Sequence, residues 1–240
     1  MTINAQGMHF QTLNDAVHAA EGSSIKIENC IGQRYIGSGL SKKKLLIQGT
    51  PGNALGAYLD GAEIVVRGNA QDATGDTMND GTICVHGSSG DATGYAMRGG
   101  SIWIQGNIGY RGGIHMKEYQ EKCPLLVVGG TAGSFLGEYQ AGGNIVVLGL
   151  RSQADKPVGN FCGMGMYGGR IYLRSRRPPA GLPERLLCTP ADEEDLAFLR
   201  PVLARFSKLF GESLEEIEAL PFYRITPDSR NPYKQLYVSN

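Results

Sequence analysis

The chain has 240 residues, of which 35 are glycine, and its 23 basic residues balance its 23 acidic ones. Glycine is therefore about twice as frequent as in an average protein, and a neutral chain lacks the basic patch by which nucleic acids and anionic membranes are bound. No apolar run approaches the length of about 20 residues that spans a bilayer, the polar start is not a secretory signal, and five scattered cysteines form no C-x-x-C motif. The sequence thus predicts a cytoplasmic protein with reduced cysteines.

Residues 1–24 are predicted to form an N-terminal cap. Apolar residues at helical spacing over residues 9–21 indicate a short amphipathic helix, and Thr12 is its predicted N-cap. Because the open end of a stack of strands can pair with another molecule, a helix at this place would block polymerisation.

Residues 25–177 carry a repeat. Glycine recurs at intervals of 19 residues, and the period is broken once, between Gly106 and Gly130. An apolar residue stands two and four positions before each repeat glycine, as Ile83 and Val85 do before Gly87. Alternation of period two is typical of strands, and a strand in every repeat predicts a single-stranded parallel β-helix, a solenoid of about seven coils. The repeat glycines are Gly49, Gly68, Gly87, Gly106, Gly130 and Gly149.

These glycines are predicted to be structural. Stacked corners need positive φ angles or a close backbone approach, and glycine allows both. A flexible linker is the alternative interpretation, but linkers carry no strands in fixed register.

An apolar column is predicted on the outside of the repeat. The residue midway in each strand should point out of the coil, because side chains alternate along a strand. With strands about 4.8 Å apart, these residues would form a stripe roughly 30 Å long, which is too large to stay exposed on a monomer. The sequence allows two covers, the C-terminal segment folded back or a partner, and Trp103 is a candidate interaction residue in either case. The outer column consists of Leu46, Val65, Cys84, Trp103, Val127, Val146 and Tyr172.

Two insertions interrupt the repeat. The step from Gly106 to Gly130 carries five extra residues around residues 114–123, and a second insertion runs from Arg151 to Pro157. Insertions in repeat proteins usually form loops on one face, which favours contacts with another molecule. Acid–base chemistry in the first loop and a plain solvated loop stay open as alternatives. The candidate contact residues in the two insertions are His115, Lys117, Glu118, Tyr119 and Arg151.

Residues 178–240 are predicted to form a helical and aromatic tail. The glycine period stops after Arg177, and apolar residues at helical spacing follow, with Thr189 as the predicted N-cap of a helix. From Pro221 onward the tail is predicted to be extended and aromatic, and it includes Tyr233 and Tyr237.

Two segments resemble a known family. Residues 141–149, with the glycines that follow them, and residues 112–143 are similar to the glycine-rich GXGXG domain at the C-terminus of the glutamate synthase large subunit, and closest to its separately encoded versions. The resemblance covers most of residues 25–175. It implies a right-handed β-helix without catalytic residues, which holds the amidotransferase and synthase domains in place. Similar domains occur in one of the subunits of formylmethanofuran dehydrogenase and in N-methylglutamate synthase.

The resemblance therefore implies a non-catalytic structural subunit of a glutamate-synthase-like oxidoreductase in glutamate biosynthesis. Its partners would be a glutamine amidotransferase and an FMN-binding synthase subunit, and FMN and iron–sulfur centres would reside in those partners, with no cofactor or metal in this chain. Two alternatives remain, a structural component of a formylmethanofuran dehydrogenase and a stand-alone enzyme with a site near residues 114–123. The sequence also leaves a homo-oligomer open.

Overall fold

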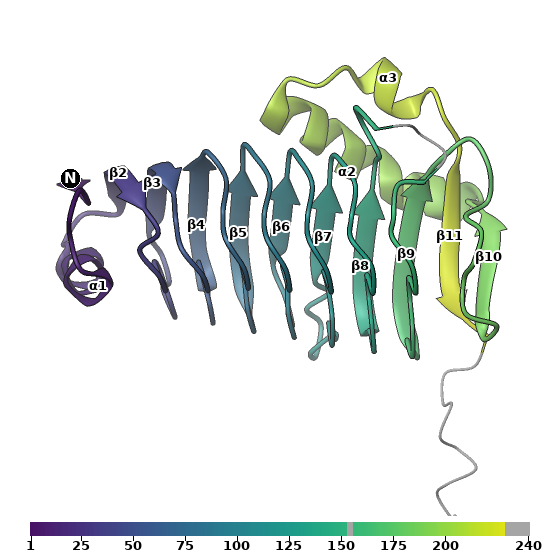
Figure 1. Cartoon of the computed structure of the whole chain (residues 1–240), viewed down its shortest axis with the longest axis horizontal. Helices are drawn as coiled ribbons and strands as arrows, with labels where there is room; N and C mark the ends of the chain where they lie inside the picture. The colour runs from purple at the N-terminus through teal and green to yellow at the C-terminus, as the bar shows by residue number, and fades with distance from the viewer. Residues whose placement is uncertain (153–155, 229–240) are drawn as a thin grey trace, which may run out of the picture.

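All strands in the described part of the chain belong to one sheet. A computed structural model describes residues 1–152 and 156–228, and its eleven strands lie in the order β1 to β9, then β11, then β10 (Figure 1). The strands are β1 (Thr2–Asn4), β2 (Ser24–Ile31), β3 (Lys44–Thr50), β4 (Asp60–Arg67), β5 (Asp80–Val85), β6 (Ser101–Ile104), β7 (Leu125–Val128), β8 (Ala141–Val147), β9 (Gly168–Arg174), β10 (Leu186–Pro190) and β11 (Phe222–Pro227), and the helices are α1 (Phe10–Ala19), α2 (Glu193–Phe210) and α3 (Leu214–Glu218).

Strands β1 to β9 are parallel to one another, and their register stacks equivalent repeat residues on one another. The inward residues of these strands are fully buried and form the main core, because each one packs on its equivalent in the next strand. One such column contains Leu45, Ile64, Ile83, Ile102, Leu126, Ile145 and Ile171.

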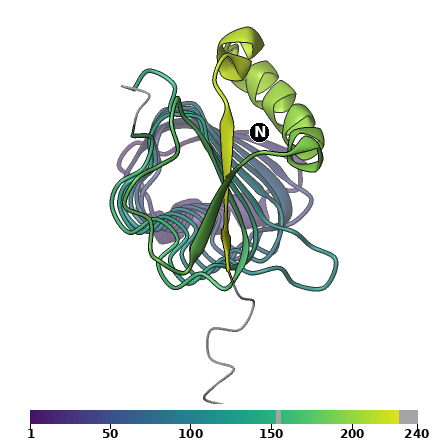
Figure 2. The ribbon, with the colours of Figure 1, turned by 90° about the vertical axis from the view of Figure 1, so that its right-hand side faces the viewer.

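The return segments between the strands are built from left-handed turns. Each one between residues 35 and 165 places three left-handed residues at alternate positions, as Arg111, Gly113 and His115 do with φ angles of 56°, 65° and 56°. These segments stack behind the sheet (Figure 2). Outside the named strands, successive segments are joined by isolated bridges, such as Ser89 with Ile108, and by single backbone hydrogen bonds, such as the one of 2.7 Å from Gly94 to Thr74.

The predicted closed solenoid, a right-handed β-helix of about seven coils, is therefore wrong. The described strands form one open sheet in which nine strands are parallel, and the tail extends that sheet with two antiparallel strands, β11 and β10. The physical reason lies in the return segments. A left-handed residue at every second position curls the backbone into successive turns, so the return path cannot form further sheets.

The repeat glycines serve two different purposes. Gly49, Gly68 and Gly149 have positive φ angles, whereas Gly87 does not. A Cβ atom on Gly87 would lie 2.6 Å from the carbonyl oxygen of Gly68. Close stacking of one corner on the next therefore requires glycine there, as it does at Gly106 and Gly130.

The two ends of the sheet are covered differently. Helix α1 inserts Leu13 and Val17 into the main core at the β1 end. It begins at Phe10 with His9 as N-cap, so the predicted N-cap is wrong. At the other end, β11 pairs with β9 and carries the start of the predicted extended tail, whereas Tyr233 and Tyr237 lie outside the described residues. No helix in the described chain is long and apolar enough to cross a membrane. The division at residues 24 and 177 stays a prediction.

Candidate interaction surface

Helix α2 covers half of the outer column. Trp103, Val127, Val146 and Tyr172 are buried in a second apolar cluster between the sheet and this helix. Phe206 is the largest buried α2 side chain in this cluster. It lies directly on the backbone of Gly129, which follows β7, because a Cβ atom on this glycine would be 2.6 Å from the ring of Phe206. Of the two covers that the sequence allowed, the C-terminal segment is the one that lies over strands β6 to β9. The other buried α2 residues of the cluster are Leu199, Val202 and Leu203.

A buried carboxylate attaches the start of α2 to the sheet. Asp195 accepts a hydrogen bond of 2.9 Å from the hydroxyl of Tyr172, and Arg224 on β11 lies 3.0 Å from its other oxygen. Burial and this bond raise the pKa of Tyr172 to about 12. Asp192 and Asp195 form a reciprocal capping box, so the helix begins there and the predicted N-cap, Thr189, lies instead on β10.

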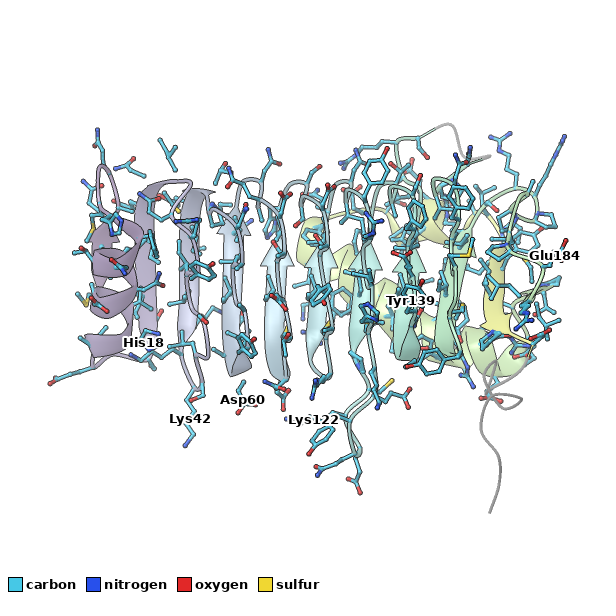
Figure 3. The ribbon with its side chains drawn as sticks, turned by 60° about the horizontal axis from the view of Figure 1, so that its bottom comes forward. His18, Lys42, Asp60, Lys122, Tyr139 and Glu184 are labelled. Atoms are coloured by element: carbon cyan, nitrogen blue, oxygen red, sulfur yellow. The ribbon has the colours of Figure 1, made fainter. Side chains whose placement is uncertain are left out.

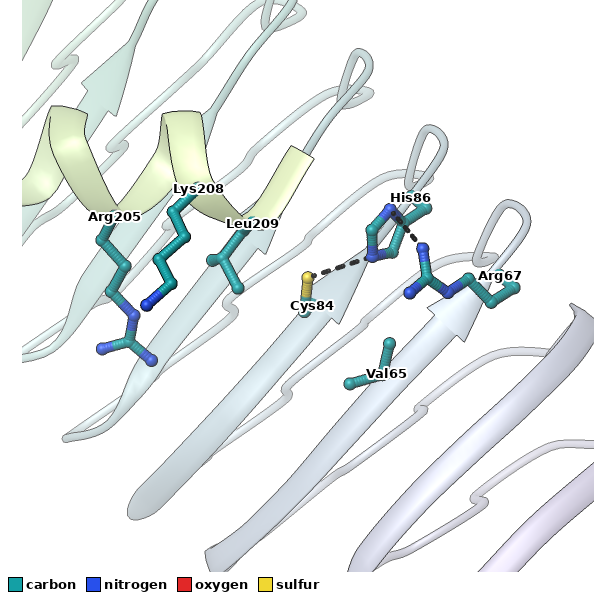
Figure 4. Close-up of a pocket in the computed structure, with 7 residues that line it drawn as sticks. All are labelled: Val65, Arg67, Cys84, His86, Arg205, Lys208 and Leu209. Carbon is teal, nitrogen blue, oxygen red and sulfur yellow. Dashed lines mark hydrogen bonds between the residues drawn. The ribbon is translucent and has the colours of Figure 1, made fainter. Parts of the chain in front are cut away.

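The other half of the outer column is not covered by α2. Leu46 and Val65 are only half-buried, and the helix ends at Phe210 beside β5. A groove of about 520 Å³ opens where the helix stops (Figure 4). We call it the basic groove; it is lined by Val65, Arg67, Cys84, His86, Arg205, Lys208 and Leu209.

The floor of the basic groove is uncharged. Arg67 Nη1 lies 3.1 Å from His86 Nδ1, and because arginine can only donate, this nitrogen accepts (Figure 4). Burial lowers the pKa of His86, and so does the charge of Arg67, which favours the same neutral ring. Burial also raises the pKa of Cys84 to about 11. The charges at the rim are therefore those of Arg67, Arg205 and Lys208.

Arg151 fixes the C-terminal end of α2. Its guanidinium pairs with Glu212, and Gln105 donates a hydrogen bond of 2.9 Å to the same carboxylate oxygen. These contacts join the turn after β8 to the connection between α2 and α3. Arg151 also borders a polar hollow of about 320 Å³, which shares His86 with the basic groove.

The other candidate residues lie in the loop before β7, at the opposite ends of the strands from Arg151. His115 stacks on Tyr139 with a distance of 5.3 Å between ring centroids. Glu118 accepts a hydrogen bond of 2.9 Å from the backbone of Gly143, while Lys117 and Tyr119 are exposed. In residues 1–152 and 156–228 no hydrogen bond joins His115 to Glu118.

Lys122 fastens this loop to the sheet. Its ammonium lies 3.1 Å from Asp80 and 3.8 Å from Asp60, and Figure 3 shows Lys122 and Asp60 along the same edge. The loop contacts are thus of a structural kind. Among the residues that the structure describes, no cluster of His, Cys, Asp or Glu could hold a metal ion.

Comparison with known proteins identifies relatives. The GXGXG motif family matches residues 8–218. An uncharacterized protein of Methanocaldococcus jannaschii is 41% identical over 251 residues, which covers 99% of this chain and 96% of the relative. A chain in the crystal structure of the formyltransferase/hydrolase complex of Methylorubrum extorquens with methylofuran superposes with a TM-score of 0.64 at 21% identity, over 87% of this chain and 75% of that chain. At this identity the likeness concerns the fold alone, whereas the match over residues 8–218 shows that the chain belongs to the GXGXG motif family.

Proposed function

We propose that the chain is a non-catalytic structural subunit of a multisubunit enzyme complex. The observation that carries the proposal is the outer column, which α2 buries from Trp103 to Tyr172 and leaves half-buried at Leu46 and Val65. An apolar surface of this kind beside the three cations of the basic groove is typical of a protein contact. The structural contacts of Glu118, Lys122 and Arg151 further support a role as a scaffold.

For the kind of complex, we favour one that transfers or hydrolyses formyl groups. The support is the likeness of fold to a chain of the formyltransferase/hydrolase complex, which was crystallised with methylofuran. In such a complex this chain would take the place of a structural component like the one in formylmethanofuran dehydrogenase, and its partners would carry out the chemistry.

A glutamate-synthase-like complex is the second candidate. It is supported by the similarity of residues 141–149 to the GXGXG domain of that enzyme and by the family match. In this case the partners would be an amidotransferase and an FMN-binding synthase, and FMN and iron–sulfur centres would lie in those subunits.

Affinity purification of the full chain, tagged at its natural level of expression, tests the proposal. We expect it to elute with other subunits in a fixed ratio, and mass spectrometry of those subunits separates the two candidates: formyltransferase or hydrolase subunits in one case, an amidotransferase and a flavoprotein in the other. Elution of the chain alone, at its own mass of 25.8 kDa, would contradict both.

A further inference from the structure

We propose that the basic groove, with the part of the outer column that continues from it over β4 and β3, binds an acidic amphipathic helix of a partner subunit. The inference rests on the proposed function, because it requires a partner, and it adds the surface and the chemistry of the contact.

The first argument is continuity with a contact already made. Helix α2 runs across the strands on the outer face of the sheet and buries apolar side chains on the column (Figures 1 and 2). Where α2 ends, the column continues through Cys84, Val65 and Leu46 in the same parallel register. The same face therefore offers a second helix the kind of surface that α2 occupies.

The size of the free face sets the length of that helix. Strands β5 to β2 are separated by three spacings of about 4.8 Å, which gives roughly 14 Å. At 1.5 Å per residue this distance corresponds to about ten helical residues, or three turns. A helix of that length can present apolar residues at two or three successive turns to Val65 and Leu46.

The second argument is charge. Within the described chain, none of Arg67, Arg205 and Lys208 forms an ion pair, although Lys44 on the same face is paired with Glu63 at 2.9 Å. Arg67 is oriented by its bond to His86, and the guanidinium of Arg205 lies 4.8 Å from the ring centroid of Trp103. These contacts hold the two guanidinium groups in place without neutralising their charges. Both groups can therefore bind carboxylates of another molecule.

The apolar floor of the groove favours a helix over a nucleic acid as its ligand. Val65, Cys84 and Leu209 provide apolar surface between the cations, and His86 is held against Phe210 with ring centroids 5.0 Å apart. Phosphates would satisfy the cations but would leave this floor in contact with water. A helix with an apolar stripe flanked by glutamates or aspartates satisfies both.

Site-specific photo-crosslinking in the full complex tests the inference. The full chain carries p-benzoylphenylalanine in place of Val65 and is irradiated in the cells that naturally make it, with the same group in place of Tyr119 as the matched position in the loop. We expect the Val65 position to crosslink to one partner segment with apolar residues at helical spacing and flanking carboxylates. In the same background, Arg67→Glu with Lys208→Glu should lower the crosslinked yield at least tenfold.

The control pair Lys42→Glu with Arg176→Glu makes the same change in net charge at two exposed positions away from the groove, and the yield should stay within twofold. Crosslinks only to a second copy of this chain, to nucleic acid or to a segment without carboxylates would overturn the inference. So would an intact complex without any Val65 crosslink, and in each of these cases the proposed function stands if partners co-purify. A chain that purifies alone overturns the inference and the proposed function together.

Discussion

Replacing Phe206 with alanine should destabilise the protein strongly, because this ring holds α2 on the sheet. The side chain is fully buried, and it contacts the backbone at Gly129 and the ring of Phe210, whose centroid is 4.7 Å away. The sheet cannot close the resulting cavity, since the amide of Gly129 is bonded to the carbonyl of Ile104 at 2.8 Å. We therefore expect a loss of about 3–5 kcal/mol in the free energy of unfolding.

Urea unfolding measures this loss, and the protein has a convenient reporter. Its single tryptophan, Trp103, lies in the cluster that Phe206 completes, so its emission should shift to longer wavelength in the variant. Phe161→Ala is the matched control, because Phe161 is 47% exposed and, among the aromatic rings of residues 1–152 and 156–228, stacks only on Phe135; it should cost no more than about 1.5 kcal/mol. A change below about 1 kcal/mol for Phe206→Ala, with unshifted emission, would refute the packing of α2 on the outer column.

Three further changes probe other contacts. Gly87→Ala should cost about 1–3 kcal/mol by overpacking the stacked corners, whereas Gly22→Ala, where a Cβ meets nothing closer than 3.9 Å, should melt like the natural protein; equal melts for both would contradict the close approach. Tyr172→Phe should cost about 1–3 kcal/mol because it removes the hydroxyl that donates to Oδ1 of buried Asp195, and an unchanged urea midpoint would argue against that bond. The lowered pKa of His86 means that the folded state favours the neutral ring, so stability should fall as the pH drops from about 6.5 through the lowered pKa and then level off. His86→Gln should remove this part of the pH dependence, and an NMR titration of His86 at or above its ordinary pKa would contradict it.

The sequence predicted the strands correctly but not the path of the return segments between them, and the reasons are physical. Alternating apolar residues and spaced glycines specify which side chains face inward. The register follows because equivalent residues of successive repeats stack on one another. The return path depends on left-handed backbone at positions such as Arg111, Phe135 and Tyr139, which are residue types without a turn preference. Nothing in their identity therefore distinguishes a turn from a strand.

The candidate surface was predicted only in part. The outer column follows from alternation, whereas its cover stayed open between the tail and a partner, and Trp103 was recognised because it is an aromatic residue in an apolar column. The cations of the groove were missed, since Arg205 and Lys208 reach it only once α2 has docked, and the start of α2 is fixed by the buried capping box of Asp192 and Asp195. A helical-spacing analysis of α2 together with the outer column could have placed Arg205 beside Trp103.

The most direct test of the central claim, a scaffold without catalytic groups, is the turnover number of the purified complex containing this chain with His115→Ala, Lys117→Ala and Glu118→Gln. Removing a general acid or base costs about 10²–10⁴ in rate. The account predicts that kcat stays within about twofold of the natural complex, well below that range, while the subunit ratio is unchanged. A fall in kcat of about 100-fold or more in an intact complex would show that this chain takes part in the chemistry and would contradict the account.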